Sequence, residues 1–116
     1  MNTVGFIKAS NAQANDRFGG IIDPDLYSNA SMSLSADGLT LVVGAPHEDS
    51  ASTTVGGVED NNGRAHSGAA YVFVKTASGW EQQAYIKARN SGVDDNFGES
   101  ISVSADGNTL VVGARL

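Results

Sequence analysis

The stretch SISVSADGNTLVVGA at residues 100–114 occurs almost unchanged at residues 31–45, as SMSLSADGLTLVVGA, with twelve of the fifteen positions identical. In both copies serine alternates with a hydrophobic residue, which is the pattern of a β-strand with one polar and one apolar face. An Asp-Gly pair then provides residues that tolerate a positive φ, and Leu-Val-Val begins a second strand. The stretch therefore predicts a β-hairpin that is present twice, with Leu34, Leu41 and Val43 of the first copy matching Val103, Leu110 and Val112 of the second in the core.

The repeat extends beyond the hairpin. FIKASN at residues 6–11 matches YIKARN at 85–90, and NDRFG at 15–19 matches DDNFG at 94–98, both at a separation of 79 residues, whereas the hairpins are 69 residues apart. The first copy thus carries ten extra residues, which we place within residues 20–30. The Asp-Pro-Asp in this segment favours a surface loop.

Two further strands are expected between the hairpins. Residues 67–76 place Tyr71 and Phe73 on one face and aliphatic residues on the other, which is typical of a strand packed between neighbours. Residues 80–88 alternate less sharply and include several polar side chains, as expected for a solvated outer strand.

Together these strands predict an all-β fold of antiparallel four-stranded, propeller-type blades. A complete blade is expected at residues 31–88, the outer strand of a preceding blade at residues 3–9, and the first two strands of the next blade at residues 100–114. One complete and two partial blades cannot close a ring. We therefore expect either a fragment of a β-propeller or a chain that associates with further copies or blades through its open edges.

Composition narrows the classes of partner. The chain has 116 residues, a formal net charge of −6 and no cysteine. A negative charge of this size argues against nucleic acid, because binding the phosphate backbone requires a basic surface. Disulfides and thiolate zinc sites are excluded, and no run of about 18 apolar residues is present, so no membrane insertion is expected.

Each copy has a Phe-Gly pair that is followed further along the chain by a Gly-Ala pair. In the first copy these are residues 18–19 and 44–45, the latter followed by Pro46, and in the second copy they are residues 97–98 and 113–114. These residues resemble the FG-GAP repeats of the integrin α-subunit β-propeller, and the run SADGNTLVVGA is closer to a bacterial subgroup of these repeats. The resemblance covers residues 1–116 as a single repeat region and departs from the family at Arg115, which stands where the pattern has proline. It implies a β-propeller in an extracellular or cell-surface protein. Phe18 and Phe97 are expected to fill the space between neighbouring blades.

The resemblance also implies a candidate calcium site. Integrin propellers hold calcium in Asp/Asn-rich hairpin loops, and the long connection at residues 46–68 is rich in the oxygen ligands that calcium prefers. The candidate ligands are Asp49, Glu59, Asp60 and Asn62. Only Asp60-x-Asn62-Gly63 follows the Asp-x-Asp-x-Asp-Gly pattern, and a solvated loop rich in turn-forming residues explains the same composition.

Acidic residues also precede both Phe-Gly pairs, at Asp16, Asp94 and Asp95. Acids before a turn usually cap or solvate it, so we expect that role for them rather than metal binding. His47 and His66 flank the long connection, but no nucleophile elbow, HExxH motif or phosphate-binding loop accompanies them, so we expect a protein that is not an enzyme.

Two functions follow from these observations. The first is a non-catalytic extracellular or cell-surface recognition and adhesion module, in which the long connection and the 20–30 insertion present a surface to a protein or glycan. The alternative is a purely architectural repeat of a large surface protein, with no ligand of its own. Oxygen ligands that converge in one class of loop would favour the first function, whereas simple turns would favour the second.

Overall fold

The computed structural model describes residues 7, 9, 16–23, 27–49, 63, 65–89 and 92–114, and for residues 20–23 and 27–30 only the backbone. The fold of these residues is all-β, as the sequence predicts. The strands are β1 (Gly20–Asp23), β2 (Tyr27–Ala30), β3 (Met32–Leu34), β4 (Thr40–Ala45), β5 (Ala69–Thr76), β6 (Gly79–Ile86), β7 (Ser100–Val103) and β8 (Leu110–Gly113). Across the described segments there is no helix long and apolar enough to cross a membrane.

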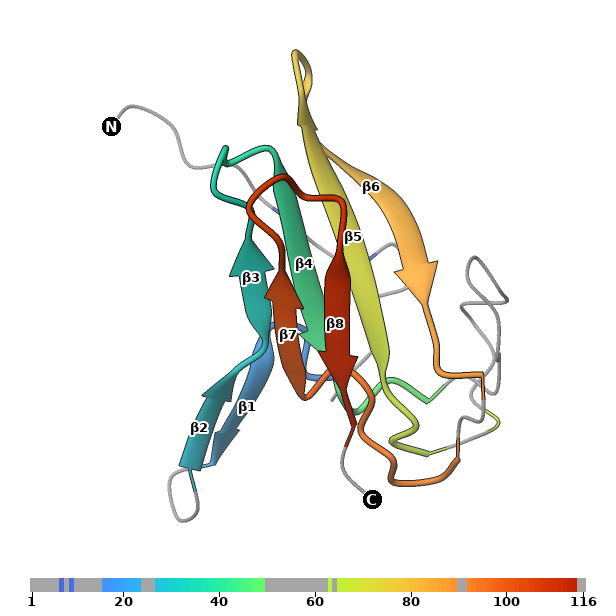
Figure 1. Ribbon diagram of the computed structural model, residues 1–116. Helices are drawn as coiled ribbons and strands as arrows, with labels where there is room; N and C mark the ends of the chain where they lie inside the picture. Colours follow the sequence, from blue (N-terminus) through green and yellow to red (C-terminus); the bar gives the residue numbers. More distant parts are fainter. Residues whose placement is uncertain are drawn as a thin grey trace.

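Strands β3 to β6 form one antiparallel sheet in the order β3-β4-β5-β6 (Figure 1). These are the four strands expected between residues 31 and 88. Strand β6 lies at the edge of the sheet, as its mixed pattern predicts, and a register shift between Val72 and Phe73 interrupts its pairing with β5. The sheet has the strand number and order of a propeller blade.

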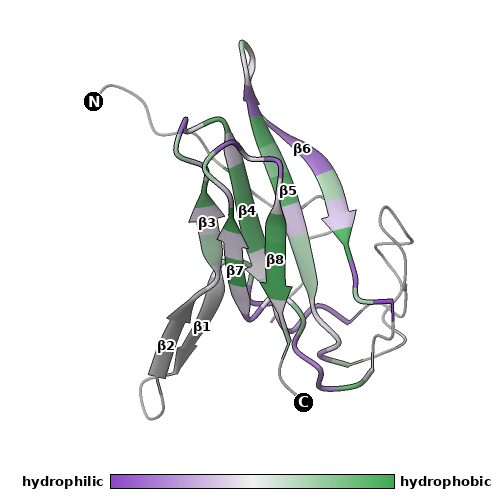
Figure 2. Cartoon of the chain, viewed as in Figure 1, coloured by the Kyte–Doolittle hydropathy of each residue, from purple (hydrophilic) through white to green (hydrophobic). Residues whose placement is uncertain are grey.

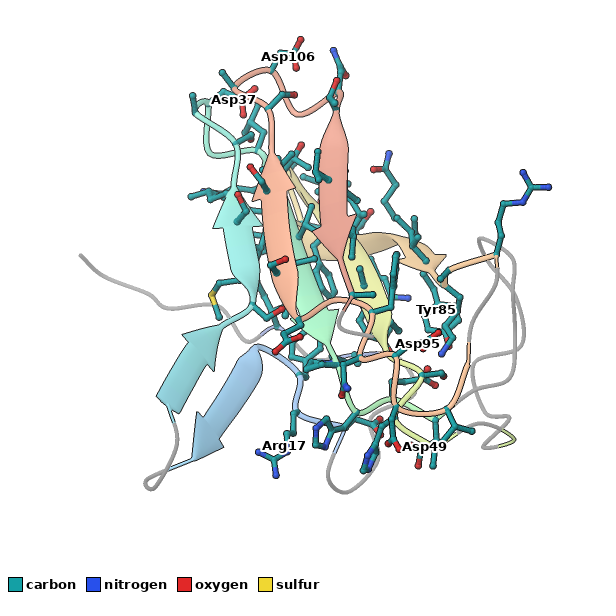
Figure 3. All side chains as sticks on the ribbon, turned by 60° about the horizontal axis from the view of Figure 1, so that its bottom comes forward. Arg17, Asp37, Asp49, Tyr85, Asp95 and Asp106 are labelled. Carbon is teal, nitrogen blue, oxygen red and sulfur yellow. The ribbon has the colours of Figure 1, made fainter. Side chains whose placement is uncertain are left out.

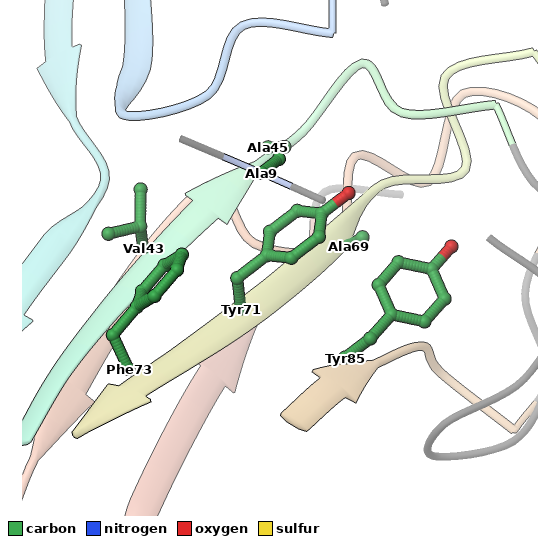
Figure 4. Packing of buried hydrophobic residues seen from close by; sticks show 7 residues of the cluster. All are labelled: Ala9, Val43, Ala45, Ala69, Tyr71, Phe73 and Tyr85. Atoms are coloured by element: carbon green, nitrogen blue, oxygen red, sulfur yellow. The ribbon is translucent and has the colours of Figure 1, made fainter. Parts of the chain in front are cut away.

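Both faces of this central sheet are apolar, because β4 and β5 carry hydrophobic residues at consecutive positions. One face, here called the tyrosine face, carries Val43, Tyr71, Phe73 and Tyr85, which are all buried (Figure 4). The other, the valine face, carries Val42, Ala70 and Val72. A strand that is apolar on both sides requires a cover on both sides.

The hairpin of β7 and β8 covers the valine face (Figure 1). The inward side of the hairpin consists of Ile101, Val103, Leu110 and Val112, and Phe97 packs in the same cluster. Hydropathy colouring shows apolar runs along β4 and β8, while polar and apolar residues alternate along β7 (Figure 2). Phe97 thus fills the space between two successive sheets, as predicted, and the two copies of the hairpin stack as neighbouring blades do.

The two Asp-Gly turns are equivalent, which confirms the repeat. In the first, the Ser35 hydroxyl donates to the Asp37 carboxylate at 2.6 Å and accepts the Thr40 N–H at 3.1 Å. The Ser104 hydroxyl donates to Asp106 at 2.7 Å and accepts the Thr109 N–H at 3.0 Å in the second. Positive φ falls on glycine in each turn, with φ of 73° at Gly38 and 76° at Gly107.

These hydrogen bonds act on the aspartates. The Ser35 hydroxyl, followed by the Leu39 N–H, lowers the pKa of Asp37 below its usual value of 3.8. The Ser104 hydroxyl, followed by the Asn108 N–H, lowers the pKa of Asp106 in the same way. In both cases the hydrogen bonds favour the charged form of the carboxyl group.

The insertion in the first copy is a hairpin and not the loop that its Asp-Pro-Asp suggests. Strand β1 pairs with β2 in register from Gly20↔Ala30 to Asp23↔Tyr27, and the pair forms a separate two-stranded sheet. Only residues 24–26, where the proline lies, fall between the strands. Proline is tolerated just outside a strand, where no backbone hydrogen bond is required of it. The expected outer strand at 3–9 lies outside the described residues except for Ile7 and Ala9.

One core prediction is wrong. The repeat predicts Leu34 in the core with Leu41 and Val43, but the Leu34 side chain is 54% exposed, while Val43 is buried and Leu41 is partly buried. Leu34 lies on β3 at the edge of the tyrosine face, where no described strand covers it. Its counterpart Val103 packs against the central sheet because that sheet is there to cover it.

Candidate functional site

The connections of the sheets differ at their two ends. One end has the short Asp-Gly turns, and the other is formed by residues 16–19, 46–49, 65–68 and 92–98, here called the loop end. Figure 3 shows Asp37 and Asp106 at the turn end and Arg17, Asp49 and Asp95 at the loop end. The loop end thus carries the longest connections and the candidate residues that the structure describes.

Backbone hydrogen bonds join these four segments to one another. His47 N–H donates to the Asp16 carbonyl at 3.2 Å, and Gly68 N–H donates to the Glu48 carbonyl at 2.9 Å. Asn96 and Phe97 donate to the carbonyls of residues 66 and 67 at 2.9 and 3.0 Å. The loop end is therefore a hydrogen-bonded layer and not a set of independent loops.

Unusual backbone conformations cluster in the same layer. Among the described residues, the non-glycine residues with positive φ are Arg17 (58°), His66 (53°), Asp94 (62°) and Asn96 (55°). All of them belong to the loop end. Arg17 and Asn96 are equivalent in the two copies, since each precedes a Phe-Gly pair. Such conformations cost free energy and persist only where surrounding structure holds them, which is common at functional sites.

A buried ion pair fixes the base of this layer. The Lys87 ammonium lies 2.8 Å from Glu48 Oε2, with side-chain exposures of 0% and 2%. Lys87 Nζ also donates to the Ser67 hydroxyl at 2.6 Å, and that hydroxyl contacts the Glu48 carbonyl at 3.3 Å. Lys87 follows β6, Glu48 follows β4 and Ser67 precedes β5. The cluster thus ties both ends of the long connection to the edge of the central sheet.

The sequence analysis does not find this cluster. Lys87 is expected on a solvated strand, and Glu48 is counted among many acids of a long loop. Lys8 occupies the same place in FIKASN that Lys87 occupies in YIKARN, but exposed residues such as Asp37 and Asp106 also recur in the two copies, so the repeat alone does not indicate that Lys87 is buried.

Above the ion pair, the surface of the loop end is polar. The Asp94 carboxylate lies 3.1 Å from the ring atom Nδ1 of His66. The backbone N–H of His66 donates to Asp49 Oδ1 at 2.7 Å. The His47 and His66 rings are stacked with their centres 4.2 Å apart. The structure thus brings together His47, Asp49, His66 and Asp94, which come from three separate segments of the chain.

Of the acids before the Phe-Gly pairs, Asp95 acts as a local cap, whereas the Asp94 carboxylate contacts His66. Asp95 Oδ2 accepts the Gly92 N–H at 2.7 Å, and Asp16 is buried. Asn96 Nδ2 donates to the Asp94 carbonyl at 2.7 Å, while its Oδ1 is buried without a protein partner. A buried acceptor of this kind is normally satisfied by a water molecule or a bound donor.

The described residues do not by themselves form a calcium site. Asp49 is the only one of the four candidate ligands among them, and it already accepts a backbone hydrogen bond. Glu59, Asp60 and Asn62 lie outside the described residues. Within the described part of the chain, no group of three histidine, aspartate or glutamate side chains converges as metal ligands do.

Residues 80–116 match the family model of the FG-GAP repeat. This segment of the chain is therefore similar to an FG-GAP repeat. No curated protein and no solved structure matches the chain. The matched residues run from β6 through Phe97 and Gly98 to β8, so the matched segment joins the outer strand of one sheet to the two strands of the next.

This placement explains the glycines of the motif. A Cβ atom at Gly44 would overlap the carbonyl oxygen of Gly98 and the hydroxyl of Ser31. The Gly-Ala pair that ends β4 therefore allows the Phe-Gly pair of the next sheet to approach its backbone. Phe18, the aromatic residue of the first pair, packs edge to face on Tyr71 and Phe73 with ring centres 5.5 and 6.0 Å apart. Both motif phenylalanines are thus packing residues.

Proposed function

We propose that this FG-GAP chain is a non-catalytic recognition module of an extracellular or cell-surface protein. In this proposal the stacked sheets are the scaffold, and the loop end binds a protein or glycan. The observation that carries it is the concentration of positive-φ residues, ring stacking and a buried ion pair at one end of the sheets. An end that only joined strands would need none of these features, as the short turns at the opposite end illustrate.

The chemistry of the surface favours a polar partner. Asp94 is largely exposed beside a stacked histidine pair, and the protein carries a net charge of −6. Carboxylates and imidazoles can accept from and donate to sugar hydroxyls or to backbone and basic side chains of a peptide. The same charge disfavours nucleic acid.

Binding to arrays of glycans and of secreted and cell-surface proteins tests this proposal. Asp94→Ala removes an exposed acid of the loop end, and Asp106→Ala removes an exposed acid of the turn end as a matched control. We expect Asp94→Ala to weaken the binding of a ligand found with the wild-type chain at least about tenfold, a loss of about 1.4 kcal/mol, and Asp106→Ala to leave it unchanged. A wild-type chain that binds no ligand, or two variants that bind equally well, would contradict the proposal.

The alternative function, an architectural repeat without a ligand, is favoured by the motif itself. Phe18, Phe97 and Gly44 all serve packing between sheets, and none of them lies on the polar surface of the loop end. Under this alternative the chain is folded and stable, but the array experiment identifies no ligand.

Calcium binding by the 46–68 connection stays a prediction from the resemblance. A cation held by the native loop raises the midpoint of thermal unfolding by mass action. We expect the midpoint to rise in millimolar calcium and to return when a chelator is added. An unchanged midpoint would remove calcium from the account without affecting the recognition proposal.

A further inference from the structure

Strands β7 and β8 pack on the valine face of the central sheet. Both sides of this interface have repeat counterparts elsewhere in the chain, and the exposure of the two can be compared. Ile101 and Val103 occupy the positions that Met32 and Leu34 occupy in the first copy, and Val111 occupies the position of Val42. The chain therefore shows each side of this interface twice, once inside the molecule and once on its surface.

The comparison reveals two exposed apolar patches. Ile101 and Val103 are partly buried against the central sheet, whereas Met32 and Leu34 are 53% and 54% exposed. Val42 is 1% exposed beneath the hairpin, whereas Val111 is 64% exposed on the outward side of β8. Each exposed patch thus consists of residues whose repeat counterparts make the contact between the two sheets.

We propose that a second copy of this chain docks on the tyrosine face at Met32 and Leu34 through the outward side of its β7–β8 hairpin around Val111. The contact repeats the packing already present within the chain. There, the side of β7–β8 that corresponds to the tyrosine face packs on the valine face. Between copies, the tyrosine face packs on the side of β7–β8 that corresponds to the valine face. Because the two patches differ, the contact is head to tail, and an open assembly keeps one free patch of each kind, one at each of its ends.

Two further contacts support this pairing. Within the chain, the Ser33 hydroxyl accepts the Val103 N–H across the sheets at 3.2 Å. Ser102 and Leu34 are the repeat counterparts of these residues, so the same hydrogen bond can form between copies. Ile7, the counterpart of Ile86, already packs on the tyrosine face, as Ile86 packs in the cluster beneath β7–β8. The tyrosine face is thus covered where Ile7 packs and is exposed at Met32 and Leu34.

Charge sets the conditions of association. Copies with a net charge of −6 repel one another, and salt screens this repulsion, while burial of the apolar patches is not weakened by salt. We therefore expect association to strengthen as the ionic strength rises.

Sedimentation velocity and light scattering of the whole chain, from micromolar to submillimolar concentration, test the proposal. Leu34→Lys removes one patch and Val111→Lys the other, while Leu39→Lys changes a residue that is 51% exposed in a turn and belongs to neither patch. We expect the average mass of the wild-type chain to rise with concentration. Each patch variant should weaken association at least about tenfold, which corresponds to about 1.4 kcal/mol, and Leu39→Lys should behave as the wild type.

Mixing the two patch variants decides the geometry. The Leu34→Lys copy keeps its Val111 patch, and the Val111→Lys copy keeps its Leu34 patch, so a mixture should form dimers that neither variant forms alone and that cannot grow further. Circular dichroism confirms that each variant is folded, and Met32→Lys replaces Leu34→Lys if the latter is not. A wild-type chain that is monomeric at every concentration, or a mixture that stays monomeric while the wild type associates, would overturn the proposal.

Discussion

Replacing Lys87 by methionine tests the anchor of the loop end. Lys87 Nζ lies 2.8 Å from Glu48 Oε2 and 2.6 Å from Ser67 Oγ, and both charged side chains are almost fully buried. Methionine keeps most of the side-chain volume but removes the charge, which leaves the Glu48 carboxylate buried without its cation. Loss of one partner of a buried pair typically costs about 3–5 kcal/mol. A domain of this size is stable by about 5–15 kcal/mol, so the expected loss is a large fraction of the whole.

Urea unfolding at pH 7, followed by the fluorescence of Trp80, the single tryptophan, measures the loss. Lys75→Met changes an exposed lysine of β5 and should alter the free energy of unfolding by about 0.5 kcal/mol or less. Adding Glu48→Gln to Lys87→Met removes the unpaired charge and should recover part of the stability. If Lys87→Met costs no more than Lys75→Met, or if Glu48→Gln brings no recovery, the ion pair does not anchor the loop end as described.

Three further predictions concern the motif, the insertion and pH. Gly44→Ala places a Cβ against the carbonyl of Gly98 and should cost about 1–3 kcal/mol in urea unfolding; an unchanged midpoint would mean that the sheets are not in close contact there. Replacing residues 20–30 by a single glutamate, as in the second copy, should change the free energy of unfolding by about 1 kcal/mol or less, because β1 and β2 pair only with each other; a loss of several kcal/mol would place the hairpin in the core. Asp37 and Asp106 have lowered pKa values, so they stabilise the fold above the ordinary value of 3.8, and this contribution is lost as the pH falls below it. Replacing both by asparagine should therefore lower stability at pH 7 and reduce its decline towards pH 3, and equal pH curves for variant and wild type would contradict the assignment.

The repeat made most of the fold predictable. Twelve identical residues in each hairpin predict equivalent turns, and the side-chain hydrogen bonds of Ser35 and Ser104 confirm the equivalence. The apolar residues on both faces of β5 predict a strand that is buried on both sides, and residues on both of its faces are buried. Local pattern is sufficient in these cases because the turn and strand interactions are made within short segments.

The prediction is less successful where the outcome depends on neighbours distant in sequence. Leu34 and Val103 have the same local pattern, yet only Val103 is covered, since burial depends on which sheet lies opposite. Lys87 has the pattern of a solvated strand, and its burial results from Glu48 and Ser67 reaching it from the connections of other strands. The loop end was thus predictable as a polar region but not as a hydrogen-bonded layer.

Hydrogen exchange of the backbone amides, followed residue by residue in the whole chain, tests most directly that the loop end is a built surface on stacked sheets. The amides of Gly68, Asn96 and Phe97 donate to carbonyls of neighbouring segments, so we predict that they exchange as slowly as amides of β4 and β5. Lys87→Met should accelerate their exchange more than Lys75→Met does. Exchange of these three amides at the rate of an unfolded peptide, with β4 and β5 protected, would show independent mobile loops and would contradict the account.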